Sequence, residues 1–335
     1  MAGVNVCRAS IGIALSDDLR AEVFDEEAEK CLSSIGRVED VGDPTLFGNA
    51  LPDVDVLITG WRMPRLEPAL LETAPRLRLI AHIGAAITPF VTHAVFERGI
   101  VVTQAGQGMA RSVAETALTM TLGLLHQVHR ADHAMRAEAA WPLAGALPAR
   151  HEILGSVIGV VGASRTGRAY IPLVQSLGAR VLLADPYVVP SEAEDLGVEL
   201  VSLKELLSRS RIVCVHAPAL PETHHMIGTA ELAALATGSG LVNTARSWLV
   251  DQAALLAELL SGRIDGAFDV FDVEPLPADH PFRTLANVLL TPHQAAASVE
   301  GRRRQGAILV EEVRRFLDGS PLVHRIRAGD PAAPA

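Results

Sequence analysis

The sequence has no excess of basic residues and no long run of hydrophobic residues. Its 335 residues contain 29 Lys and Arg against 39 Asp and Glu, which gives a net charge of −10. Proteins that bind nucleic acids or membrane surfaces in a general way carry a basic face, so this charge argues against both classes. No apolar run reaches the roughly 20 residues that span a bilayer. The first residues lack a basic segment ahead of an apolar one, so we predict no signal peptide.

Cysteine is also scarce. Cys7, Cys31 and Cys214 are far apart, and an odd number of cysteines does not make a complete disulfide framework. Their spacing does not match that of a zinc site either. This pattern is typical of a reducing compartment, so we predict a cytoplasmic protein without a bound metal.

Short apolar runs alternate with helical stretches in the first hundred residues. We expect strands at 10–15, 55–60, 77–84 and 99–104. This βαβ order predicts a parallel sheet. From about Met109 to Met135 the sequence keeps a helical period, which predicts one long helix suited to joining two domains. Three histidines of that helix, His126, His129 and His133, favour a partly exposed interface over a metal site.

The same alternation starts again after a Pro- and Ala-rich connector at 141–150. Six further apolar strands are expected, at 157–162, 180–185, 211–217, 240–245, 266–271 and 287–292. Strands that are apolar throughout are buried on both faces, as in a doubly wound sheet. A last helix is expected over 297–319, ended by Gly319 and Pro321. The chain is long enough for two domains of this kind.

The stretch VIGVVGASRTGRAY, residues 157–170, has the features of a dinucleotide-binding turn. An apolar strand leads into Gly162, which supplies a tight turn, and Gly167 stands where the following helix packs closely on the strand. Ser164 takes the place of the middle glycine, where the backbone comes nearest the phosphates. Two glycines alone are weak evidence in a chain with 27 glycines.

Asp185 strengthens this interpretation. It ends the next predicted strand, about 20 residues after Gly162, where a carboxylate can accept hydrogen bonds from both ribose hydroxyls. No basic residue follows it in ADPYVVP to compensate a 2′-phosphate, so the sequence favours NAD over NADP. The alternative is a strand–helix turn that binds nothing.

Three polar residues lie at or just beyond the carboxyl ends of the later strands, the edge where open α/β sheets bind ligands: Arg246, Glu274 and His293. An arginine can hold a carboxylate with two hydrogen bonds and polarise a neighbouring carbonyl. A histidine can give or take the proton that accompanies hydride transfer, and a carboxylate beside it fixes the ring and favours its protonated form. Taken alone, each of these residues could equally belong to a surface ion pair or a turn. Together with the cofactor turn, they indicate an oxidoreductase site.

These motifs occur in an order that resembles the D-isomer-specific 2-hydroxyacid dehydrogenase family over nearly the whole chain. The matching segments include RSVAETAL, VVGASRTGR, HAPALPETHHMIG, NTAR, GAFDVFDVEP and LLTPHQA. The resemblance implies an α/β protein with two doubly wound parallel-sheet domains, in which a Rossmann cofactor domain is inserted into a flavodoxin-like substrate domain. It implies a substrate domain of residues 1–108 and 299–335 and an NAD-binding domain of residues 109–298. Homodimers formed largely by the cofactor domains are expected.

The resemblance also implies roles for individual residues. Arg246 would bind the substrate, Glu274 would orient His293, and His293 would be the acid/base. Asp269 matches the aspartate beside the nicotinamide carboxamide. The implied cofactor-binding set is Gly162, Ser164, Arg165, Thr166, Gly167, Asp185, His216, Pro218, Thr244 and Asp269. The backbone amides of Ala85 and Ala86 would bind the substrate carboxylate.

The sequence departs from the family pattern at residues that determine substrate specificity. Ala86 and Thr88 stand where the loop at 81–90 usually has a glycine and an aspartate, and Ser247 and Trp248 follow Arg246 in place of small residues. Glu274 argues against a formate dehydrogenase, which carries glutamine there. We expect no regulatory domain like that of many phosphoglycerate dehydrogenases, and His82 alone offers little to a phosphate. A glyoxylate- or hydroxypyruvate-type reductase fits better.

The sequence thus predicts an NAD-dependent D-2-hydroxyacid dehydrogenase that transfers a hydride between NADH and a small 2-keto acid. Two alternatives stay open: an NAD-sensing, protein-binding module like a co-repressor, and an inactive homologue. The intact set of Arg246, Glu274 and His293 favours catalysis.

Overall fold

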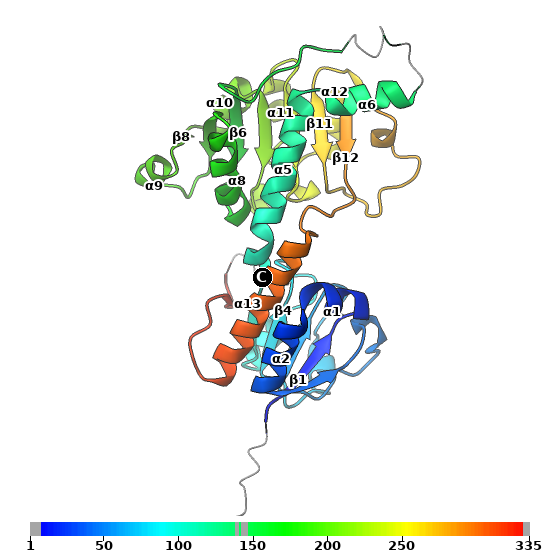
Figure 1. Ribbon diagram of the computed structural model, residues 1–335, viewed down its shortest axis with the longest axis vertical. Coiled ribbons are helices and arrows are strands. Elements are labelled where there is room, and N and C mark those ends of the chain that lie inside the picture. The colour runs from blue at the N-terminus through cyan, green and yellow to red at the C-terminus, as the bar shows by residue number, and fades with distance from the viewer. Residues whose placement is uncertain (1–7, 138–140, 142–146, 331–335) are drawn as a thin grey trace, which may run out of the picture. The chain divides into compact units, whose positions relative to one another are not determined.

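The computed structural model describes residues 8–137, 141 and 147–330, which form two compact units. The first consists of Met1–Met109 and Ala297–Ala335, and the second of Ala110–Ala296. Each unit is a sheet covered by helices (Figure 1). The first unit is therefore built from both ends of the sequence and the second from its uninterrupted middle. Cys7 and residues 142–146 of the predicted connector lie outside the described residues.

The sheet of the first unit has six strands. They are β1 (Ser10–Ala14), β2 (Arg37–Asp40), β3 (Val56–Thr59), β4 (Leu79–His82), β5 (Val101–Gln104) and β13 (Arg325–Ile326). Their order is β13-β5-β4-β3-β1-β2, and every neighbouring pair is parallel except β13 with β5. The order 2-1-3-4-5 of the parallel strands is the predicted flavodoxin-like one. Strand β2 and the antiparallel edge strand β13 were not among the predicted strands.

Side chains of successive residues in these strands point to opposite faces of the sheet. On one face, Ile11 and Ile13 of β1 pack in one apolar cluster with Leu309 and Val313. These leucine and valine side chains belong to α13 (Val299–Leu317), which contacts α1 (Asp17–Val23), α2 (Glu26–Ile35) and β4 (Figure 1). The other face has its own cluster, to which α3 (Pro68–Leu71) and α4 (His93–Glu97) contribute.

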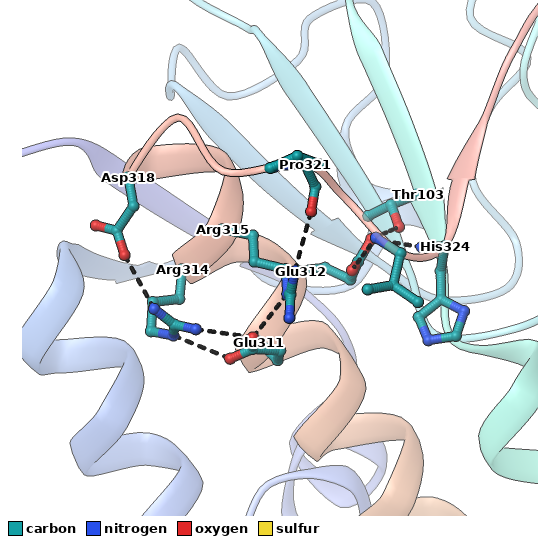
Figure 2. A network of polar contacts seen from close by, with 9 residues as sticks. Thr103, Glu311, Glu312, Arg314, Arg315, Asp318, Pro321 and His324 are labelled. Carbon is teal, nitrogen blue, oxygen red and sulfur yellow. Dashed lines mark hydrogen bonds and ion pairs between the residues drawn. The ribbon is translucent and has the colours of Figure 1, made fainter.

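A buried carboxylate joins α13 to the segment that follows it (Figure 2). Glu312 is 1% exposed and accepts hydrogen bonds from Thr103 Oγ1 at 2.6 Å and from the backbone amides of Val323 at 2.9 Å and His324 at 3.0 Å. Because Thr103 lies in β5 and His324 precedes β13, this one carboxylate fixes the antiparallel pairing of the two strands.

The sheet of the second unit is parallel throughout and has seven strands. They are β6 (Val157–Val161), β7 (Arg180–Ala184), β8 (Glu199–Leu200), β9 (Ile212–Val215), β10 (Gly240–Asn243), β11 (Asp265–Phe268) and β12 (Val288–Leu290). Their order is β12-β11-β10-β9-β6-β7-β8. This is the doubly wound order of a dinucleotide-binding sheet, with its switch point between β6 and β9. The six predicted strands are confirmed; β8 is too short to show as an apolar run.

Helices cover both faces of this second sheet. They are α5 (Ala110–Leu125), α6 (Val128–Arg136), α8 (Arg165–Ser176), α9 (Pro190–Asp195), α10 (Leu203–Arg209), α11 (Thr229–Ala234) and α12 (Gln252–Leu260). Helix α5 packs against α8 and along β9, β10 and β11 (Figure 1). None of the helices in the described part of the chain is both long and apolar enough to cross a membrane.

The prediction of one helix from Met109 to Met135 is wrong. The chain breaks between α5 and α6 at Gln127, whose φ of 56° lies in the left-handed region. Its side-chain amide donates to the Leu124 carbonyl at 2.9 Å and to Asp265 Oδ2 at 2.7 Å, which stabilises this conformation. His126 and His129 therefore lie on opposite sides of the break. His129 is buried, with Nε2 3.8 Å from Asp265 Oδ2.

Candidate active site

The predicted cofactor turn joins β6 to α8 and is built around two required glycines. Gly162 has a φ of 93°, and a Cβ placed on it would lie 2.7 Å from the backbone nitrogen of Ala217. A Cβ on Gly167 would collide with the carbonyl oxygen of Gly162. Both positions therefore exclude any larger residue without a backbone shift. The turn lies at the switch point of the sheet, where such folds bind their ligands.

Ser164 begins α8 as its N-cap residue. Its φ of −61° and ψ of 178° are those of ordinary extended backbone, so this position does not need glycine. Its Oγ accepts a hydrogen bond from the Gly167 amide at 3.4 Å. Arg165 and Thr166 follow in the first turn of the helix. The serine thus stabilises the helix end that the turn presents.

Asp185 directly follows β7 instead of ending it, and its carboxylate lies against the cofactor turn. Oδ2 accepts from the Ala163 amide at 2.7 Å, and Oδ1 accepts from the Tyr187 amide at 2.8 Å. These two bonds hold the carboxylate at the carboxyl edge of the sheet.

Two polar side chains at the carboxyl ends of β9 and β10 are buried without a partner. Both ring nitrogens of His216 and the hydroxyl of Thr244 lack a hydrogen-bond partner among the described residues. Burial lowers the pKa of His216 to about 3, so its ring is neutral. Buried polar atoms are normally satisfied, so unsatisfied ones beside a glycine turn fit a bound polar group such as a dinucleotide. Pro218 follows in the exposed part of the same loop.

His293 and Glu274 are in direct contact. Nδ1 of His293 lies 2.6 Å from Oε2 of Glu274, and Oε1 of Glu274 accepts from the Phe271 amide at 3.0 Å. The backbone of His293 has a φ of 52°, in the left-handed region. Both side chains line a cavity of about 580 Å³, whose apolar wall includes Leu276 and Leu290.

Asp269 holds the loop that carries His293. It is 1% exposed, and Oδ1 accepts from Thr291 Oγ1 at 2.5 Å and from the Gln294 amide at 2.9 Å. Oδ2 accepts from the Ala295 amide at 2.9 Å. The sequence predicted a cofactor contact for Asp269, whereas the contacts in the structure are those of an anchor for this loop. No local pattern could have revealed it, because the partners are more than 20 residues away.

Arg246 follows β10 and is partly buried. The Asn243 side-chain amide donates to the Arg246 carbonyl at 2.8 Å, and Arg246 Nη1 donates to the Ala245 carbonyl at 2.6 Å. Burial lowers the pKa of Arg246, and the charge of Glu274 acts in the opposite direction. Glu274 thus interacts with both other members of the predicted set, which the carboxyl edge of one sheet brings together.

Comparison with known proteins identifies the family. Residues 118–295, more than half of the chain, match the family model "D-isomer specific 2-hydroxyacid dehydrogenase, NAD binding domain". A glyoxylate reductase of Korarchaeum cryptofilum is 34% identical over 270 residues, which cover 80% of this chain and 81% of the relative. The chain belongs to the D-isomer specific 2-hydroxyacid dehydrogenase family. Its second unit carries the NAD-binding domain of that family, so NAD is the cofactor.

Other members of the family differ in length. A D-3-phosphoglycerate dehydrogenase of Mycobacterium leprae is 34% identical over 303 residues, which cover 89% of this chain and 56% of the relative. The chain thus spans about half the length of the curated phosphoglycerate dehydrogenases that it matches. Among solved structures, a phosphoglycerate oxidoreductase from Rhizobium etli has a TM-score of 0.75 at 30% identity, covering 96% of this chain and 99% of the other.

The loop that this family resemblance connects with the substrate carboxylate follows β4 in the first unit. Ala85 and Ala86 are partly buried, and their backbone amides donate to no acceptor among the described residues. His82, just before the loop, is fully buried with Nδ1 3.1 Å from Thr59 Oγ1. Burial lowers the pKa of His82 to about 3, so it brings no positive charge to a phosphate.

Proposed function

We propose that this chain is an NAD-dependent oxidoreductase that transfers a hydride between NADH and the carbonyl carbon of a 2-keto acid, forming a D-2-hydroxy acid. The observation that carries the proposal is the 2.6 Å contact between His293 and Glu274, next to Arg246, in a unit that matches an NAD-binding domain. A proton donor, a carboxylate partner and a cation at one sheet edge are the groups that carbonyl reduction needs.

The proposed mechanism assigns one task to each side chain. Bound NADH supplies the hydride. Protonated His293 donates a proton from Nε2 to the carbonyl oxygen, while its Nδ1–H donates to Glu274. Arg246 of the second unit holds a carboxylate and polarises the carbonyl of the keto acid. In the first unit, the backbone amides of Ala85 and Ala86, which donate to no acceptor among the described residues, are the donors assigned to a substrate carboxylate. In the reverse direction, neutral His293 accepts the hydroxyl proton.

The proposed cofactor contacts follow the same logic. The turn from Gly162 to Gly167 and the first turn of α8 accommodate the pyrophosphate, and Asp185 accepts from the ribose hydroxyls. His216, Pro218, Thr244 and Asp269 complete the set at the ends of the neighbouring strands. A carboxylate at Asp185 with no basic residue in the five that follow disfavours a 2′-phosphate.

We further propose a small substrate of the glyoxylate or hydroxypyruvate type. The relative named a glyoxylate reductase supports this choice, and the neutral state of His82 disfavours a phosphorylated acid. A cytoplasmic homodimer, formed largely by the cofactor domains 109–298, completes the proposal.

The decisive experiment measures NADH oxidation with glyoxylate, hydroxypyruvate, phenylpyruvate and branched-chain keto acids. His293→Ala should nearly abolish turnover and leave NADH binding, followed by fluorescence, intact. Wild-type-like activity of this variant would contradict the assignment of His293 as the acid/base. Binding of NADH without turnover of any acid would favour the NAD-sensing, protein-binding module instead. No binding at millimolar NADH would favour an inactive homologue, and a monomer in light scattering would contradict the dimer.

A further inference from the structure

Trp61 lies beside the loop to which the proposed function assigns the substrate carboxylate. It follows β3, and the loop Gly84–Ala86 follows the neighbouring strand β4, so both stand at the carboxyl edge of the first sheet. A Cβ placed on Gly84 would lie 3.2 Å from Trp61 Nε1 and 2.7 Å from His82 Nε2. A side chain at this position would therefore collide with the imidazole and press on the indole nitrogen, so glycine lets both rings approach the loop closely.

The hydrogen-bond donors at this loop have no acceptor in the part of the chain that the structure describes. The backbone amides of Ala85 and Ala86 donate to none of the described residues, and neither does the indole N–H of Trp61, a residue that is 41% exposed. Trp248 offers a contrast, because its indole N–H already donates to the Leu220 carbonyl at 2.9 Å. An indole nitrogen can only donate, and a carboxylate has about four sites that accept. Several unused donors in one place suit a carboxylate.

Two side chains of α13 hold this arrangement in place. The guanidinium carbon of Arg302 lies 4.7 Å from the centroid of the Trp61 ring, a cation–π contact, and Arg302 also pairs with Glu22 at 3.3 Å. Nη1 of Arg302 donates to Gln305 Oε1 at 3.3 Å. Buried Gln305 in turn donates to the carbonyl of Ile83, the residue directly before the loop. The ring and the loop are thus oriented by one connected set of contacts, and the charge of Glu22 is balanced by Arg302.

We propose that Trp61 is a further substrate-binding residue, whose indole N–H donates a hydrogen bond to the carboxylate held at Ala85 and Ala86. The inference rests on the proposed function and adds to it a donor that the sequence analysis did not identify. Arg302 and Gln305 are positioning residues in this arrangement, since they act through Trp61 and through the loop.

Trp61→Phe tests the proposal, because phenylalanine keeps an aromatic ring under Arg302 and removes only the N–H. The variant loses one hydrogen bond to a charged group. From the usual strength of such a bond, KM for the best keto acid should rise about tenfold. The kcat should change by less than about twofold, and the Kd of NADH should not change. Gly84→Ala, whose methyl group would displace the imidazole or the indole, should also raise KM. An unchanged KM in Trp61→Phe overturns the proposal.

Oxamate, an unreactive analogue of a 2-keto acid, gives a readout that does not need turnover. In calorimetric titrations of the NADH complex, Trp61→Phe should bind oxamate about tenfold more weakly than the wild type. Equal affinities, or no binding to the wild type, overturn the inference. Failure of the proposed function is distinguishable, because the wild type would then turn over none of the keto acids. Glu312→Gln is the matched control: it alters a buried residue of the same unit and helix, and should leave KM and oxamate binding unchanged even where it lowers stability.

Discussion

The carboxylate of Glu274 connects the ring of His293 to the backbone of Phe271. One oxygen lies 2.6 Å from Nδ1 of the histidine, and the other accepts from the Phe271 amide at 3.0 Å. The hydrogen bond from the Phe271 amide holds the carboxylate in place, and the carboxylate in turn holds the ring of His293. Because Nδ1 is occupied, Nε2 is the nitrogen left for a substrate.

Glu274→Gln should therefore lower kcat by about 10- to 100-fold, since general acid–base catalysis contributes roughly 10²- to 10⁴-fold and part of it is retained. Glutamine keeps the size of the side chain and an acceptor for the Phe271 amide but loses the charge. Steady-state kinetics with the best keto acid would measure the loss, and an NADH titration should give an unchanged Kd. A variant with full kcat would show that the carboxylate does not assist His293.

Substitutions of Ser164 should separate helix capping from cofactor binding. Loss of the N-cap in Ser164→Ala should cost about 1 kcal/mol of unfolding free energy, whereas Ser164→Gly should cost only a few tenths. Neither change should alter NADH affinity much, because the serine backbone is already in an ordinary conformation. Urea unfolding and NADH fluorescence titration measure the two effects. Much tighter NADH binding by Ser164→Gly would mean that the serine obstructs the turn.

Asp185→Asn should reduce the preference for NADH over NADPH by about tenfold or more, because the repulsion between a carboxylate and a 2′-phosphate is removed. Asparagine can still accept from the Ala163 amide through its side-chain oxygen, so the turn should stay folded. The ratio of kcat/KM with the two cofactors is the measurement. An unchanged ratio would show that Asp185 does not determine the preference for NADH.

The buried histidines predict acid sensitivity. His82 and His216 have pKa values of about 3, below the ordinary 6.5, because burial disfavours the charged ring. The unfolded chain then binds protons that the folded chain does not, so stability present above pH 6.5 is lost as the pH falls towards 3. Each histidine contributes a slope of up to about 1.4 kcal/mol per pH unit.

His82→Asn should flatten this slope, since asparagine does not titrate and retains a polar group for Thr59. Urea unfolding at pH 7, 6 and 5 measures it. If the wild type and the variant lose stability equally on acidification, His82 is not the source. His216 offers the same comparison in the second unit.

Much of the fold follows from local patterns in the sequence. Parallel strands that are buried on both faces are apolar throughout, so runs such as VIGVV and VLIT are visible without a structure. The cofactor turn is also visible in the sequence, because Gly162 has a left-handed φ of 93° and a side chain on Gly167 would collide with the carbonyl oxygen of Gly162 in the same turn. The edge where Arg246, Glu274 and His293 meet follows from the parallel order of the strands.

The missed features depend on contacts between distant residues. The break at Gln127 is stabilised by Asp265, and strand β13 by Glu312, so no local sequence signal marks either. Asp269 and Trp61 carry ordinary side chains whose surroundings come from other strands and helices. Ser164 differs from these residues: its place in a glycine motif predicts a contact with the phosphates, whereas serine is also a common helix N-cap, which is its role in the structure.

The placement of α13 has a consequence for synthesis on the ribosome. Leu309 and Val313 complete an apolar cluster with strand residues near the start of the chain, and Glu312 closes the edge of the same sheet. At about 5–20 residues per second, the intervening unit takes roughly 10–40 s to be made. During that interval the second unit can fold from a continuous stretch, while one face of the first sheet is covered by α1 and α2 alone. The apolar side chains that Leu309 and Val313 cover in the finished protein thus stay exposed until α13 has been made.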